Sequence, residues 1–207
     1  MLEEAAIAMM KRILCSAWMA VATLIALPAM AIDASQVPVA KQTKPGLYVD
    51  AKEAYALKQQ FGDSALFIDV RTRGEVSYTG MATVVDAQVP LFEHPPNAPW
   101  DDKAGRFKME FNNGFESEVA RRIAARGLGK HDTVIVICRS GDRSTKAVNL
   151  LTEAGYTKVY TVIDGFEGDT AKEGPDAGKR VVNGWKNAGL PWTYKLEKDK
   201  LYFPPSN

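Results

Sequence analysis

The segment CRSGDRS, residues 138–144, places a cysteine directly in front of a short polar stretch with two arginines and a glycine. The residues before it, Val134 to Ile137, form an apolar run that is typical of a strand buried on both faces. The residues that follow, from about Ser144 onward, have the apolar spacing of a helix. A cysteine between a buried strand and a helix is a candidate nucleophile.

The polar stretch has the composition of an anion-binding loop. Residues 139–142 must curl tightly to connect strand and helix, and a curled loop directs successive backbone N–H groups inward. Together with the N-terminal end of the helix, these groups favour an anion, and Gly141 can adopt the positive φ that such a turn needs. The same field favours the thiolate form of the cysteine. The candidate residues are Cys138 as nucleophile, with Arg139, Ser140, Gly141, Asp142 and Arg143 as ligands of the anion.

The alternative is a purely structural role, in which Cys138 is a small buried residue at a strand end, followed by arginines on a solvated turn. Because a strand end, a glycine, two arginines and a helix start coincide here, we favour the nucleophile. The two histidines, His94 and His131, have no cysteine or second histidine at ligand spacing, so we expect no metal and no cofactor.

The elements around this loop predict a single α/β domain. Asp50 and Glu53 predict a capping box at the start of a helix that Gly62 ends. Alternation of strands with helices implies a mostly parallel sheet flanked by helices on both faces. We expect strands at residues 65–70, 83–91, 133–138 and 158–163, further helices from Phe115, from Ser144 and over 178–189, and an irregular segment over 92–114.

The N-terminal region resembles a secretory signal peptide. Lys11 and Arg12 precede an apolar stretch that closes on Ala29-Met30-Ala31. A membrane anchor is the alternative, but Pro28 and the small residues favour cleavage and a periplasmic location. The expected organisation is a signal peptide at 1–31, a linker at 32–45, the domain at 46–195 and a C-terminal tail at 196–207.

The composition of the chain limits the classes of binding partner that we expect. The net charge of +1 gives no basic excess for nucleic acid, and no second apolar segment suggests membrane contact after cleavage. Cleavage would remove Cys15, one of the two cysteines, and leave Cys138 alone without a disulfide partner. The remaining thiol is therefore either buried and inert or chemically active.

The loop CRSGDRS resembles the active-site loop of the rhodanese family of sulfurtransferases. Three more segments are similar to that family, and the resemblance spans about residues 45–194. These segments are DVRTRGE at 69–75, VIDGFEGD at 162–169 and GWKNAGLPW at 184–192. The chain departs from the family at Gly80-Met81-Ala82, where many members have Gly-His-Ile, and in the length of the 92–114 segment.

The resemblance implies a mechanism through a persulfide on Cys138. The thiolate attacks the outer sulfur of a donor anion such as thiosulfate, and a thiol, a thiol protein or cyanide then removes that sulfur. By analogy Arg139 holds the sulfonate oxygens of the donor and Arg143 braces the loop. Supporting roles fall to Ser144, Asp69, Arg71 and Glu75, and we expect the last three to be structural ion-pair residues.

Two alternatives stay open. A cysteine phosphatase or arsenate reductase also holds an anion above a cysteine, but such families use Cys-x5-Arg, whereas residues 138–143 are Cys-x4-Arg. A smaller ring of amides suits one sulfur atom better than a tetrahedral oxyanion. The other alternative is a domain that carries or binds sulfur and turns over only with its protein partner.

Overall fold

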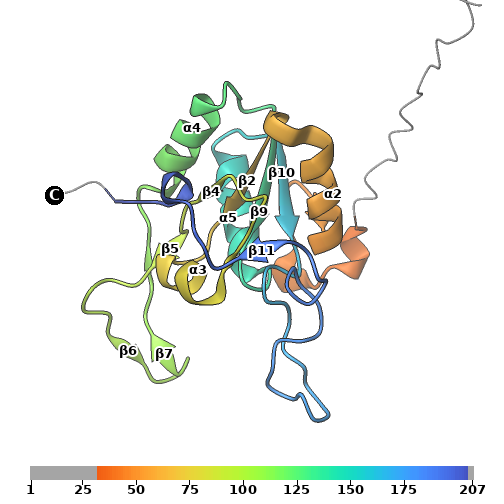
Figure 1. Cartoon of the computed structure of the whole chain (residues 1–207), viewed down its shortest axis with the longest axis vertical. Helices are drawn as coiled ribbons and strands as arrows, with labels where there is room; N and C mark the ends of the chain where they lie inside the picture. Colours follow the sequence, from red (N-terminus) through yellow and green to blue (C-terminus); the bar gives the residue numbers. More distant parts are fainter. Residues whose placement is uncertain (1–31, 205–207) are drawn as a thin grey trace, which may run out of the picture.

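The computed structural model describes residues 32–204, so the predicted signal peptide lies outside the described residues. The centre of the fold is a five-stranded sheet in the order β1-β10-β9-β2-β4, in which all neighbouring strands run parallel (Figure 1). This confirms the predicted α/β class. The strands are β1 (Tyr48–Val49), β2 (Ala65–Asp69), β4 (Ala87–Gln88), β9 (Thr133–Ile137) and β10 (Lys158–Val162).

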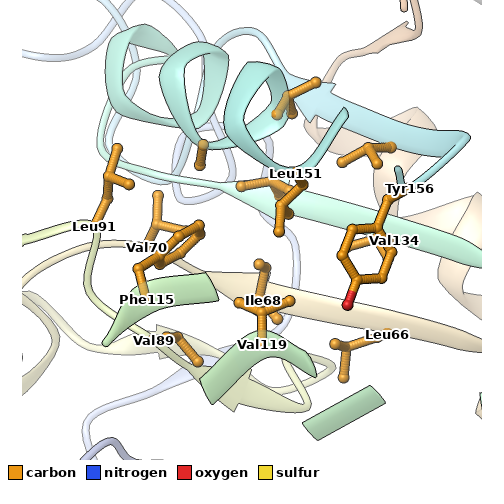
Figure 2. Packing of buried hydrophobic residues seen from close by; sticks show 14 of the residues in the cluster. Leu66, Ile68, Val70, Val89, Leu91, Phe115, Val119, Val134, Leu151 and Tyr156 are labelled. Carbon is orange, nitrogen blue, oxygen red and sulfur yellow. The ribbon is translucent and has the colours of Figure 1, made fainter. Parts of the chain in front are cut away.

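Helices cover both faces of the sheet. On one face, α4 (Phe115–Ala125) and α5 (Asp142–Glu153) pack on side chains of β2 and β9. Figure 2 shows Val119 of α4, Leu151 of α5 and Ile68 of β2 meeting in this cluster. On the other face, α2 (Ala51–Phe61) and α3 (Arg73–Thr79) pack on the opposite side chains of the same strands.

The helix starts follow local sequence signals. At α2 the Asp50 carboxylate accepts the Glu53 N–H at 2.8 Å and Glu53 accepts the Asp50 N–H at 2.9 Å, so the predicted capping box forms. The same arrangement between Thr72 and Glu75 starts α3, a short helix that the apolar pattern did not reveal. A capping box leaves two fewer backbone N–H groups without a partner, which stabilises a helix start.

The prediction of a helix over residues 178–189 is wrong. This segment consists of turns, and Thr170 forms an isolated antiparallel bridge with Arg180. Gly178, Gly184 and Gly189 all have positive φ, which a right-handed helix cannot accommodate.

The strand predicted over 83–91 is much shorter in the structure. Only Ala87–Gln88 joins the central sheet, as β4. The residues before it, β3 (Met81–Ala82), pair instead with β11 (Trp192–Thr193) in an antiparallel bridge between distant parts of the chain. Met81 and Ala82 precede the predicted strand, and residues 83–84 form a turn, so the predicted strand is shortened at both ends.

The segment predicted to be irregular forms two short antiparallel ladders, one outside the other. The inner ladder pairs β5 (Phe92–Glu93) with β8 (Glu110–Phe111), and the outer one pairs β6 (Trp100–Asp101) with β7 (Arg106–Phe107). We call residues 92–111 the hairpin arm. In Figure 1 β6 and β7 project beyond α3, away from the central sheet. No helix within residues 32–204 is long and apolar enough to cross a membrane.

Candidate active site

Cys138 lies immediately after β9, at the carboxyl end of the parallel sheet, where ligands of such folds bind. The preceding carbonyl, that of Ile137, accepts the Val70 N–H at 2.9 Å, and the Cys138 carbonyl accepts the Phe166 N–H at 2.8 Å. The backbone around the cysteine is thus held from the side of β2 and from the side of β10. The residue is 1% exposed, so the surrounding loop controls access to its sulfur.

Gly141 shapes the loop that follows. Its φ of 99° is in the left-handed region, as the sequence predicted, and it is the N-cap of α5. A Cβ at this position would lie 2.3 Å from the carbonyl oxygen of Ile163, so only glycine fits. The turn directs the Gly141 N–H to the Sγ of Cys138, with a donor–acceptor distance of 3.2 Å.

The first turn of α5 provides further polar groups near the sulfur. The first helical hydrogen bond runs from the Thr145 N–H to the Gly141 carbonyl at 3.0 Å, so the amides of residues 142–144 have no helical acceptor. The Ser144 hydroxyl lies 3.6 Å from Sγ, donates to the Gly141 carbonyl at 2.8 Å and accepts from the Thr161 hydroxyl at 3.0 Å. The unpaired amides and the helix dipole favour negative charge at this position.

Arg143 braces the loop against α3. Its guanidinium donates to both carboxylate oxygens of Glu75, at 2.6 and 2.5 Å, and the two side chains are only 13% and 21% exposed. Burial by itself raises the pKa of Glu75, but the hydrogen bonds and charge of Arg143 outweigh it, helped by the Thr72 N–H and the charge of Arg71, and lower it to about 2. Glu75 therefore caps α3 and fixes the active-site loop at the same time.

Asp69 and Arg71 form a separate ion pair, which is fully buried. The Nη2 of Arg71 donates to Asp69 at 2.7 Å and to the Gly80 carbonyl at 2.8 Å, while its Cζ lies 4.0 Å from the centre of the Phe166 ring. Neither member of the pair lines the cleft described below. The pair ties the end of β2 to the end of α3, and Glu75 belongs to the Arg143 contact instead.

The side chain of Arg139 has spare hydrogen-bonding capacity. Its backbone is clamped, because its carbonyl accepts the Glu167 N–H at 2.9 Å and a Cβ on Gly165 would lie 2.5 Å from its carbonyl carbon. Arg139 is among the residues that line the cleft, its guanidinium forms no ion pair with a described carboxylate, and its buried Nε has no hydrogen-bond partner within residues 32–204. A guanidinium held in this way can bind an anionic ligand.

A cleft of about 640 Å³ opens in front of the loop. One wall consists of Ser140, Asp142 and neighbouring loop residues, and the hairpin arm supplies the other. The sequence indicated this wall only through the unusual length of the 92–114 segment. The lining residues that sequence reasoning missed are Phe92, His94, Asp101, Arg106, Phe107, Lys108, Met109 and Lys146.

The segment predicted as a linker, residues 32–45, supports the loop from behind. Val37 is buried, and the Lys41 Nζ donates to the Ile163 carbonyl at 3.0 Å and to Asp169 at 2.9 Å. The Lys41 carbonyl in turn accepts the Thr145 hydroxyl at 3.1 Å. These contacts hold the residues after β10 against the start of α5.

Together these groups suit nucleophilic chemistry by a sulfur anion. Cys138 supplies the sulfur, Gly141 and the start of α5 supply N–H donors, and Arg139 supplies a cation toward the cleft. Within residues 32–204, no three His, Cys, Asp or Glu side chains are grouped to hold a metal ion.

Comparison with known proteins agrees with the fold. The family model of the rhodanese-like domain matches residues 50–172. Uncharacterized proteins of Rickettsia rickettsii (RP600 homolog) and Rickettsia conorii (RC0915) are each 30% identical over 132 residues, which cover 64% of this chain and 85% of theirs. The crystal structure of Rv0390 from M. tuberculosis is 28% identical, with a TM-score of 0.54, and the match covers 72% of this chain and 97% of that one.

Proposed function

The chain belongs to the family of rhodanese-like domains, and we propose that it moves a sulfane sulfur from thiosulfate or a related donor to a thiol or cyanide. Membership of the family supports sulfur transfer in general. The observation that carries the proposal is the Cys138 sulfur, which receives the Gly141 N–H at 3.2 Å beside the N-terminal end of α5. A buried sulfur with such donors is suited to stay anionic between two transfers.

The first transfer loads the cysteine. The Cys138 thiolate attacks the outer sulfur of thiosulfate, a bond forms between the two sulfurs, and the bond from the outer sulfur to the sulfonate breaks. Sulfite leaves with the electron pair of that bond, and the cysteine keeps a persulfide with one negative charge. Arg139 lines the cleft and its guanidinium has no described carboxylate partner, which supports its assignment to the sulfonate oxygens of the donor.

The second transfer removes the sulfur from the Cys138 persulfide. An acceptor thiolate or cyanide attacks the outer sulfur of the persulfide, the bond within the persulfide breaks, and Cys138 returns to the thiolate. No oxidant or reductant is consumed in either step. We assign Arg143 to bracing the loop, because both of its terminal nitrogens are bonded to Glu75.

We also propose that the protein works outside the cytoplasm after removal of residues 1–31. The support is the basic start, the apolar stretch and the Ala29-x-Ala31 end of the sequence. In that setting, the acceptor would be a small thiol or a thiol protein of the same compartment.

The decisive test uses intact-mass spectrometry on the chain that begins at Ile32. Incubation with thiosulfate alone should add one sulfur atom, and cyanide or a small thiol should remove it. Cys138→Ser should abolish the gain, because it removes the nucleophile with little change in volume, and circular dichroism should show an unchanged fold. Ser117→Ala is the control, since Ser117 is exposed on α4 and does not line the cleft, and this variant should still take up sulfur.

Two results would redirect the proposal. If several sulfane donors leave the mass unchanged while an aryl phosphate is hydrolysed, the protein is a cysteine phosphatase. If sulfur is taken up but neither cyanide nor small thiols remove it at a useful rate, the protein is a sulfur carrier that waits for a specific partner.

A further inference from the structure

The cleft is much larger than the donor requires. Its volume of about 640 Å³ corresponds to roughly twenty water molecules at their share of liquid volume. Thiosulfate is one sulfonate group with one additional sulfur, and cyanide is smaller still. Because the sulfite formed from the donor leaves before the acceptor attacks, donor and acceptor use the cleft in turn. We therefore take the additional volume as space for an acceptor that is larger than the donor.

The charge of the cleft is unbalanced. Five cationic side chains, three carboxylates and Cys138 line it, so with the sulfur anion counted the excess is one positive charge. Among the cations only Arg143 has a carboxylate partner within residues 32–204; the others are Arg139, Arg106, Lys108 and Lys146. Arg139 is assigned to the donor, so Arg106, Lys108 and Lys146 are left without an assigned partner among the described residues.

Two of these unpaired cations, Lys108 and Lys146, lie on different structural elements. Lys108 belongs to the hairpin arm, and its side chain makes no described hydrogen bond. Lys146 belongs to α5, and its Nζ lies 5.7 Å from the centre of the Phe92 ring at the base of the arm. Phe92, Phe107 and Met109 add apolar surface between the charged groups. Such a site suits an organic molecule that has both a carbon skeleton and negative charge.

We propose that the acceptor is a small organic thiol that carries carboxylate groups, and that Lys108 and Lys146 select it. This inference rests on the sulfur transfer proposed above. In the second transfer the acceptor thiolate approaches a persulfide that is also negatively charged, so the two reactants repel each other. Lysines beside the path offset this repulsion and attract the carboxylates.

The atoms balance in this step. The thiolate sulfur of the acceptor forms a bond to the outer sulfur of the persulfide, while the bond from that sulfur to the Sγ of Cys138 breaks. The electron pair of the broken bond stays on Sγ. The products are the Cys138 thiolate and an organic persulfide that still carries the carboxylates.

The test separates the two transfers. The protein is loaded with thiosulfate, excess donor is removed by gel filtration, and the added sulfur is confirmed by intact mass. Its loss is then followed with mercaptosuccinate, 2-mercaptoethanol and cysteamine, which are anionic, neutral and cationic, at equal thiolate concentrations. We expect mercaptosuccinate to react about tenfold faster than 2-mercaptoethanol, the scale for two exposed lysines that each attract one carboxylate.

The variants ask whether the two lysines cause this preference. In the double variant Lys108→Gln with Lys146→Gln, the ratio of the mercaptosuccinate rate to the 2-mercaptoethanol rate should fall to about twofold or less. Lys158→Gln removes an exposed lysine at the start of β10, at the opposite end of the sheet, and should keep the wild-type ratio. Added salt should also lower the wild-type ratio, because the lysines are exposed.

Equal rates for the three thiols would overturn the inference, and so would a preference that survives in the double variant. Rapid unloading by a reduced dithiol protein such as thioredoxin, with mercaptosuccinate inactive, would show that the acceptor is a protein instead. A chain that takes up no sulfur in the loading step would refute the proposed function itself. That failure is seen before any acceptor is added, so it is distinct from a failure of charge selection.

Discussion

Replacing Glu75 with glutamine should destabilise the folded protein by about 3 kcal/mol at neutral pH. Glu75 accepts both terminal nitrogens of Arg143, and its pKa is lowered from 4.5 to about 2 although burial alone would raise it. At 1.36 kcal/mol per pKa unit, this shift is worth about 3 kcal/mol when the carboxylate is ionised in both states. Glutamine also serves at this position of a capping box, so the substitution isolates the charge.

The sign of the effect gives it a pH signature. Because the folded-state pKa lies below the unfolded value, the stabilisation is present above 4.5 and is lost as the pH falls toward 2. Urea unfolding at pH 7 and pH 3 should therefore show the gap between wild type and Glu75→Gln shrinking by about 2 kcal/mol. The loading rate with thiosulfate should fall in parallel at pH 7, since Arg143 would no longer be fixed.

A matched control lies on the same helix as Arg143. Glu153 pairs with Lys44, but these side chains are 55% and 58% exposed, and such surface pairs contribute about 1 kcal/mol or less. Glu153→Gln should therefore cost little and show no comparable change between pH 7 and pH 3. If Glu75→Gln loses as little unfolding free energy as this control, the Glu75–Arg143 pair contributes no more than a surface pair. That result would refute the inference that the pair braces the loop.

Three further outcomes are expected. Arg139→Ala should raise the KM for thiosulfate by about one to two orders of magnitude, the loss of one charge-assisted contact, and an unchanged KM would remove Arg139 from donor binding. Burial raises the pKa of Asp164 from 3.8 to about 6, so the destabilisation from its ionisation grows as the pH rises from 3.8 to about 6 and is fully present above that pH. Asp164→Asn should therefore raise the melting temperature at pH 8 but not near pH 4, and equal melting shifts at both would refute this. N-terminal sequencing of exported protein should begin at Ile32, whereas an intact membrane-bound start would indicate an anchor.

The sequence predicted what depends on neighbouring residues. The apolar run before Cys138, the capping box of Asp50 and Glu53 and the positive φ of Gly141 are local properties, and each is found in the structure. Helix α3 had a similar signal in Thr72 and Glu75, but it is too short for an apolar period to show.

The sequence could not predict what depends on distant contacts. The pairing of Glu75 with Arg143 joins residues that are 68 positions apart, and nothing in either segment specifies the other. The cleft wall likewise depends on how the hairpin arm folds back upon itself through the pairs β5–β8 and β6–β7. The predicted helix over residues 178–189 does not form, because three glycines there have positive φ. The backbone of this segment depends on long-range packing, which the local sequence does not show.

Lys41 lies outside the residues that the family model matches, because that match begins at residue 50. Yet it holds the Ile163 carbonyl and Asp169 behind the loop, and it accepts a hydrogen bond from Thr145 at the start of α5. An expression fragment cut at the similarity boundary would keep Cys138 and lose this rear support. For truncation, chimera building or transfer of the domain into another protein, the working unit is therefore longer than the unit that sequence comparison delimits.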